Sequence, residues 1–142
     1  MVDTPLTLTN ARVVTPGGVH EGWLRVEDGR VAALGADHQV PGHTRDVGGR
    51  WVVPGLVDSH IHGGVGHGFP DADIEGARET IAFNRARGVT SLIGSLVAAS
   101  PEDTLAQVEV LAELCQAGEL AGIHLEGPFI ARSRCGAHDP DL

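Results

Sequence analysis

The stretch VPGLVDSHIHGG, residues 53–64, decides how this chain is interpreted. An apolar run with several β-branched residues leads into two histidines, His60 and His62, and then into two glycines. Side chains alternate across a strand, so the two imidazoles are expected to project from the same face. Two imidazoles side by side at the end of a strand form half of a divalent-metal site. Taken by itself, the His-x-His spacing is a weak signal, because many surface and packed histidines share it.

A second strand-like segment, GIHLEGP at residues 122–128, ends in a similar way. It is short and apolar, and it reaches His124 and Glu126 just before a Gly-Pro turn. Two strands that both end in ligand-type residues are better explained by one site than by two accidents. The sequence therefore predicts a shared metal site made of His60, His62 and Glu126. His124 shares a face with Glu126 and is expected inside the fold beside the ligands, not as a ligand itself.

From Pro54 onward the pattern predicts strands that alternate with helices. The segment Ser100-Pro101 is typical of a helix start, and an apolar period from Leu105 to Cys115 predicts that helix's buried face. The expected elements are strands at 56–60, 89–97 and 120–126, and helices from the cap at Asp73 to residue 87 and from 101 to 117. Such alternation indicates a parallel sheet covered by helices, in which ligands gather at the carboxyl ends of the strands. A closed (β/α)8 barrel needs about 250 residues. We therefore expect an α/β fold in which residues 54–142 form the first βα units of an incomplete (β/α)8, TIM-like barrel.

Residues 1–53 have a different character and predict a small β-rich segment of the β-sandwich type. Two strand-like runs, at 22–27 and 30–35, flank Asp28-Gly29, which is a strong signal for a two-residue hairpin. Further extended segments are expected at 6–14 and 44–53. These strands are short, and the segment is expected to need additional strands to close a core.

Composition narrows the classes of function. The chain has 142 residues, and its 42% hydrophobic and 20% charged residues are typical of a globular protein. A net charge of −9 with scattered arginines disfavours nucleic acid as a partner. No apolar run approaches the roughly 20 residues that span a membrane, and the first residues lack the pattern of a signal peptide. Cys115 and Cys135 do not have a metal or redox spacing, so we expect a cytoplasmic protein.

Together, the motifs resemble a known family. PGLVDSHIHG at residues 54–63 is similar to the first barrel strand of the amidohydrolase superfamily. HLEGPF at 124–129, followed by CGAHDP at 135–140, resembles the N-acetylglucosamine-6-phosphate deacetylases within it. This resemblance implies a metal-dependent hydrolase that releases acetate from N-acetylglucosamine 6-phosphate to give glucosamine 6-phosphate, in amino-sugar catabolism.

The resemblance also implies roles for particular residues. Glu126 corresponds to the carboxylate ligand of the catalytic metal, and His60 and His62 to a pair that some members use for a second ion. Ala137 and His138 correspond to a loop pair that contacts the sugar. No catalytic residue is assignable, because the family's general base and its remaining histidine ligands come from later strands. The implied cofactor is one or two divalent ions, zinc first, with iron, manganese or cobalt as alternatives. The implied partners are a small sugar phosphate and, for the full-length protein, a second copy in a homodimer, with neither nucleic acid nor membrane.

Two alternatives remain open from the sequence. Another amidohydrolase, of the dihydroorotase or hydantoinase type, would use a modified lysine as a bridging ligand. This chain has no lysine and places Glu126 at the strand end, which favours the deacetylase. The second alternative is a non-catalytic, truncated product that only binds a metal or a partner.

Overall fold

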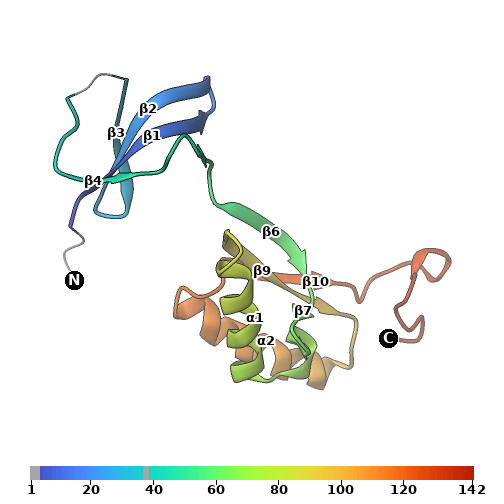
Figure 1. The fold of residues 1–142 in the computed structure, drawn as a ribbon. Helices are drawn as coiled ribbons and strands as arrows, with labels where there is room; N and C mark the ends of the chain where they lie inside the picture. Colours follow the sequence, from blue (N-terminus) through green and yellow to red (C-terminus); the bar gives the residue numbers. More distant parts are fainter. Residues whose placement is uncertain (1–3, 37–38) are drawn as a thin grey trace. The chain divides into compact units, whose positions relative to one another are not determined.

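The computed structural model describes residues 4–36 and 39–142, and it divides the chain into two units, residues 1–54 and 55–142 (Figure 1). Residues 1–3, the first of those expected to lack a signal peptide, lie outside the described residues. The chain is a mixed α/β protein, as expected. No helix among the described residues is long and apolar enough to cross a lipid bilayer.

The first unit is built around strand β1 (Leu6–Thr15), which pairs with three other strands. It runs antiparallel to β2 (Gly18–Glu27) and parallel to β4 (His43–Asp46) and β5 (Trp51–Val52), while β3 (Arg30–Gly35) pairs with β2. A small core of Ala11, Val13 and Leu24 lies on this five-stranded sheet.

The hairpin between β2 and β3 confirms the interpretation of Asp28-Gly29. Both turn residues have positive φ, 50° at Asp28 and 69° at Gly29, which is the backbone of the tight turn that matches the twist of two antiparallel strands. The extended segment expected at 44–53 is in fact two short strands. Gly48 and Gly49 separate them with φ of 62° and 75°, values that few other residues adopt.

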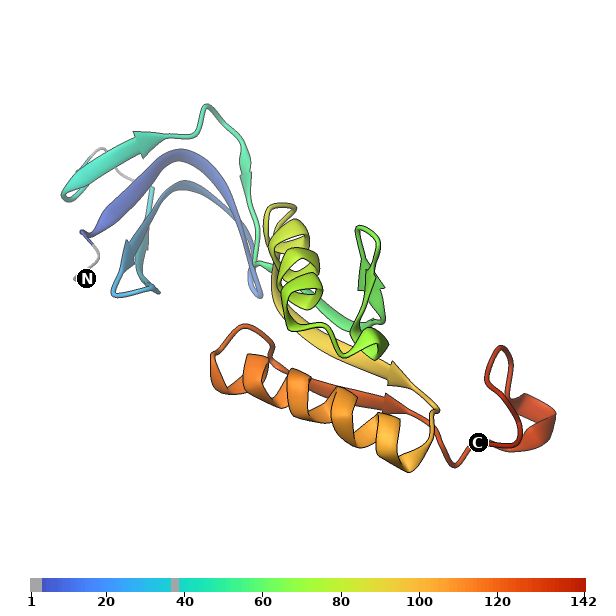
Figure 2. The same cartoon turned by 90° about the horizontal axis from the view of Figure 1, so that it is seen from below.

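The second unit contains a parallel three-stranded sheet in the order β10-β9-β6. Its strands are β6 (Leu56–Ile61), β9 (Val89–Val97) and β10 (Gly122–Glu126). Helices α1 (Ile74–Arg85) and α2 (Pro101–Gln116) connect them, so each strand follows the previous one by a helical crossover (Figure 2). Between β6 and α1 lie a two-stranded hairpin, β7 (Gly63–Gly64) with β8 (His67–Gly68), and the short 3-10 helix η1 (Phe69–Asp71). A second 3-10 turn, η2 (Arg132–Arg134), follows β10.

The helix boundaries follow from local chemistry. The Asp73 side chain accepts a hydrogen bond from the backbone of Glu75 at the start of α1, and the Ser100 hydroxyl accepts one from Asp103 at the start of α2. Helix α1 ends at Arg85, two residues earlier than expected, and β10 begins at Gly122 instead of residue 120.

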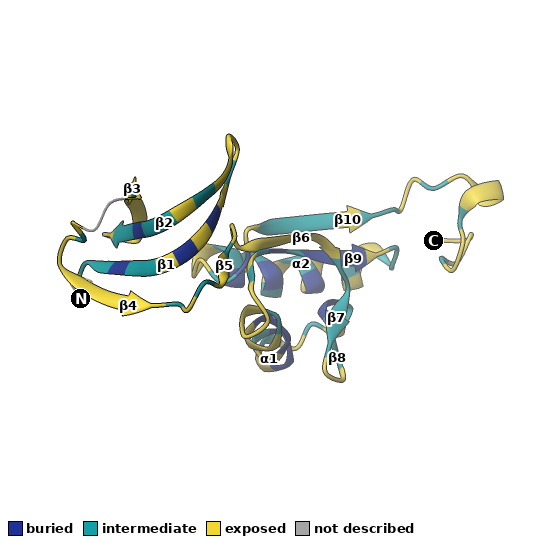
Figure 3. Cartoon of the chain, turned by 45° about the horizontal axis from the view of Figure 1, so that its top comes forward, coloured by how far each residue is buried: buried dark blue, intermediate teal, exposed yellow. Residues whose placement is uncertain are grey.

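Both helices cover the same face of the sheet. Leu92 and Leu96 of β9 share one buried cluster with Ile81 of α1 and with Leu111 and Leu114 of α2. Figure 3 shows buried residues in β9 and in both helices. The expectation that Leu105 belongs to this buried face was wrong, because 60% of its surface is exposed.

The opposite face of the sheet is the one that matters for the site. Ile61 packs against the helix-side core, so its neighbours His60 and His62 point away from the helices. Strands β6 and β10 lie on either side of β9 and run parallel to it. Residues about 65 positions apart in the sequence therefore meet at the carboxyl-terminal end of this sheet.

Candidate metal centre

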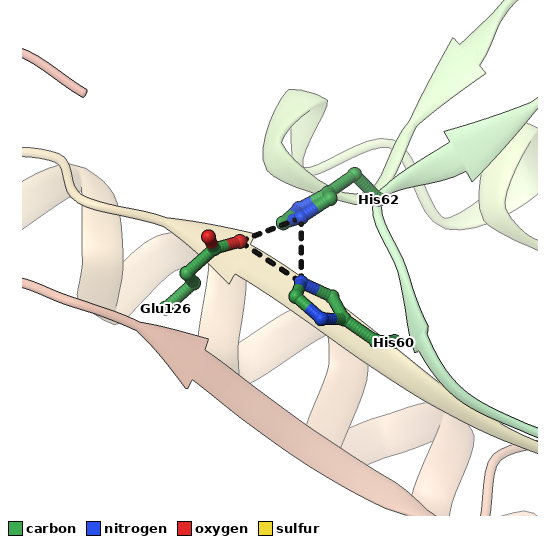
Figure 4. Close-up of side chains that lie close together, drawn as sticks. All are labelled: His60, His62 and Glu126. Carbon is green, nitrogen blue, oxygen red and sulfur yellow. Dashed lines mark hydrogen bonds and ion pairs between the residues drawn. The ribbon is translucent and has the colours of Figure 1, made fainter. Parts of the chain in front are cut away.

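Three side chains meet at the carboxyl end of the parallel sheet (Figure 4). The Nε2 atoms of His60 and His62 are 3.1 Å apart, and each lies 2.9 Å from Oε2 of Glu126. Imidazoles contributed by the end of β6 and a carboxylate contributed by the end of β10 therefore converge on one point. The structure brings together all three residues that the sequence predicted as ligands.

The ring of His62 is held by the backbone of β9. Its Nδ1 lies 3.1 Å from the carbonyl oxygen of Ser95. A carbonyl oxygen can only accept, so Nδ1 carries the hydrogen and the neutral ring presents a lone pair at Nε2. A hydrogen bond of this kind is the usual support of a histidine that binds a metal.

His60 is supported from two directions. Its backbone N–H donates to Oδ1 of Asp58 at 3.1 Å, so the Asp58 carboxylate satisfies a backbone donor. Its ring meets the ring of His124 edge to face, with centroids 4.8 Å apart. Nδ1 of His124 in turn lies 3.2 Å from the hydroxyl of Ser95, so His124 lies between the expected ligand His60 and strand β9.

Glu126 is held in its charged form. Its hydrogen bond with His60 is the largest cause that lowers the pKa of the carboxyl from 4.5 to about 2, and the contact with His138 is the next. The carboxylate is therefore ionised at neutral pH, which is the state that binds a cation.

The donor set fits a divalent metal. Two imidazole nitrogens and a carboxylate oxygen approach one another within 3.1 Å, and without a cation or a proton between them their lone pairs repel. Two nitrogens and one oxygen suit zinc and its first-row neighbours, with bonds of about 2.0–2.2 Å. Three protein ligands also leave a position open for water or substrate.

The loop after β10 places the two residues expected to contact the sugar. Ala137 is exposed, whereas only 11% of the His138 side chain is exposed. His138 Nε2 lies 3.3 Å from Oε1 of Glu126, so this residue touches the carboxylate of the site directly. Its contact with a sugar stays a prediction.

Two features of the site were missed from sequence. Ser95 is completely buried and contacts both His62, through its carbonyl oxygen, and His124, through its hydroxyl. The backbone N–H of Ala98 donates to Nδ1 of His138 at 3.3 Å. Thr90 and Ser91 lie in the same strand, so Ser95 does not stand out in the sequence, and no sequence pattern marks a backbone donor such as that of Ala98.

His67 belongs to a different group of side chains. Its Nε2 lies 3.3 Å from Glu79 and its Nδ1 3.8 Å from Asp73, at the start of α1. The two ring nitrogens thus face two different carboxylates, which fixes the β7–β8 hairpin to the helix and offers no common point for an ion.

Known proteins are similar to this chain in both sequence and fold. No family model matches the chain. The N-acetylglucosamine-6-phosphate deacetylase of Mus musculus is 34% identical over 143 residues, which cover 94% of this chain and 35% of that protein. The N-acetylgalactosamine-6-phosphate deacetylase of Escherichia coli O157:H7 is 32% identical over 86% of this chain and 34% of that protein.

A solved structure agrees with these relatives. A variant of the N-acetyl-D-glucosamine-6-phosphate deacetylase of Mycobacterium smegmatis, in complex with N-acetyl-D-glucosamine-6-phosphate, is 40% identical with a TM-score of 0.87. The match covers 99% of this chain and 37% of that one, so this chain spans a little over a third of the proteins it matches. The expected resemblance is confirmed: over nearly its whole length, the chain is similar in sequence and fold to a part of the N-acetylglucosamine-6-phosphate deacetylases.

Proposed function

We propose that this chain is part of a metal-dependent amide hydrolase that removes the acetyl group from N-acetylglucosamine 6-phosphate, in amino-sugar catabolism. The observation that carries the proposal is the convergence of His60, His62 and Glu126 at the strand ends. The similarity to deacetylases supports the choice of substrate, because those relatives act on N-acetylated sugar phosphates, as their names state.

The chemistry explains why such a site is needed. An amide is a poor electrophile and water is a poor nucleophile. When bound, a divalent ion lowers the pKa of water and polarises the carbonyl, so that it addresses both difficulties. In this chain, His60, His62 and Glu126 would hold the ion. Ala137 and His138 would contact the sugar, and the general base that takes the proton from water and returns it to the amine would come from other residues of the protein.

The wider architecture and the cofactor are part of the same proposal. The three βα units are taken as the beginning of a (β/α)8 barrel, and the five-stranded sheet as one layer of a β-sandwich. The metal is proposed to be zinc, with iron, manganese or cobalt as alternatives and with one or two ions at the site. The whole protein is proposed to be a cytoplasmic homodimer, as the resemblance implies.

The two alternative functions differ from the deacetylase in the ligands or the turnover that they require. A hydantoinase or dihydroorotase would use a modified lysine as a bridging ligand, whereas these 142 residues contain no lysine and place Glu126 at the strand end. A non-catalytic product would bind a metal through His60, His62 and Glu126 without turning over any amide.

The decisive experiment uses the protein expressed from the full reading frame that contains this chain. Purified protein loaded with Zn²⁺ is incubated with N-acetylglucosamine 6-phosphate, with its galacto epimer and with a hydantoin, and acetate or ring-opened product is measured. We expect acetate from the gluco substrate, less from its epimer, and no ring opening. Ring opening without acetate would favour the hydantoinase, and a protein that binds zinc without turnover would favour the non-catalytic product. We also expect no acetate from the 142 residues alone, because they offer no assignable general base.

A further inference from the structure

His138 points inward from an otherwise exposed loop. Its neighbours Gly136, Ala137 and Asp139 are exposed, while 11% of the His138 side chain is. Elsewhere in this loop the hydrogen bonds join nearby residues, as from the backbone of Arg134 to Ala131. His138 therefore connects the loop to the end of β9 and to the metal centre.

The contacts of His138 determine where its hydrogen lies. The backbone N–H of Ala98 faces Nδ1 at 3.3 Å, and a backbone N–H can only donate. In the neutral ring, Nδ1 is then the acceptor and Nε2 carries the hydrogen. Nε2 in turn faces Oε1 of Glu126 at 3.3 Å, so the ring donates to that oxygen.

The two oxygens of Glu126 thus have different partners. Oε1 accepts from His138, while Oε2 faces Nε2 of both His60 and His62 at 2.9 Å. A carboxylate with one oxygen engaged in this way cannot swing freely to offer both oxygens to an ion. Partners of this kind orient the ligands of a metal and tune its affinity.

The geometry points to His138 as a positioning residue that donates from Nε2 to Oε1 of Glu126 and leaves Oε2 as the single metal-binding oxygen. This inference rests on the proposed function only in taking Glu126 as a metal ligand. It differs from the sugar contact that the resemblance implies for His138, because it acts on the metal before any sugar is present.

Two substitutions separate the acceptor role of the His138 Nδ1 atom from the donor role of its Nε2 atom. In His138→Asn, the shorter amide can accept from Ala98 as Nδ1 does, but it cannot reach Glu126. In His138→Gln, the longer amide can donate to Glu126 as Nε2 does. His43, which is exposed on β4, provides the matched surface control as His43→Asn. A role limited to anchoring the loop would be preserved by Asn, whereas a role in positioning the carboxylate would be preserved by Gln.

The test measures the Kd for Zn²⁺ alone, by competition with a chromophoric chelator, in the protein expressed from the full reading frame. We expect His138→Asn to weaken zinc binding by about 10–100-fold and His138→Gln to stay within about threefold of wild type. Wild-type affinity in His138→Asn, or a loss confined to His138→Gln, would overturn the inference.

If either variant does not fold, a crystal structure of the zinc-loaded wild type decides. Oε1 hydrogen-bonded to His138 with only Oε2 on the metal supports the inference, and both oxygens on the metal refutes it.

These outcomes are independent of the proposed function. A protein that shows the expected ranking of zinc affinities but releases no acetate would refute the deacetylase and leave the positioning role standing. A protein that releases acetate while His138→Asn binds zinc as tightly as wild type would refute the positioning role alone.

Discussion

Replacing Glu126 with glutamine tests whether the proposed metal site depends on its carboxylate. The substitution preserves size but removes the charge of a carboxylate whose Oε2 lies 2.9 Å from two imidazole nitrogens. Because His138 donates to the other oxygen, it should attract the amide oxygen of the glutamine and turn the amide NH₂ toward His60 and His62. The NH₂ group is a donor and cannot bind a cation.

The expected magnitude follows from this geometry. Loss of an indirect support of a metal typically costs about 10–100-fold in affinity, so loss of a direct ligand with its charge should cost more than about 100-fold. Acetate release should fall below about 1% of wild type, because both the metal and its bound water depend on this ligand. Metal content after gel filtration and acetate release would be measured on the same samples of the full-length protein. Glu109→Gln, at an exposed position of α2, is the control. Retention of metal and rate in Glu126→Gln would refute the assignment of the site.

Three further predictions follow from packing and ionisation. Leu111 is completely buried, so Leu111→Ala should lower the free energy of unfolding, measured by urea titration, by about 2–5 kcal/mol. The control Leu105→Ala, at an exposed position, should change it by less than about 0.5 kcal/mol. Equal effects of the two substitutions would contradict the assigned core. Cys115 packs against the core, and burial raises the pKa of its thiol. Iodoacetamide should therefore alkylate Cys135 faster than Cys115, as measured by peptide mapping over time. Faster alkylation of Cys115 would contradict this packing. The lowered pKa of Glu126 means that its ionised form stabilises the metal-free fold above pH 4.5 and that this contribution is lost as the pH falls through about 2. The difference in unfolding free energy between wild type and Glu126→Gln should shrink over that range, and a constant difference would argue against the contacts of this carboxylate.

The parts of the fold that local rules determine were predictable from the sequence. The strand Val89–Val97 has the expected boundaries, because a run rich in apolar and β-branched residues lies between Gly88, which follows one helix, and Ser100, which caps the next. The turn at Asp28-Gly29 was predictable because two positive φ values favour these residue types. The alternation of strand side chains was enough to place His60 and His62 on one face.

Contacts between distant segments could not be predicted in this way. The helical period assigned Leu105 to the buried face, but the sheet and η1 pack against the turns that carry Leu111 and Leu114. The contact of His138 with Glu126 depends on how an irregular loop folds back, and no periodicity encodes that path. Ser95 supports His62 through its backbone carbonyl, a group that every residue has and that sequence therefore cannot single out.

The central claim is that His60, His62 and Glu126 bind one metal ion together. It is tested most directly by anomalous diffraction at the zinc edge from crystals of the zinc-loaded, full-length protein. The account predicts an anomalous peak about 2.0–2.2 Å from Nε2 of both histidines and from Oε2 of Glu126. A fully occupied zinc peak elsewhere, with Glu126 still paired to the two imidazoles, would contradict it.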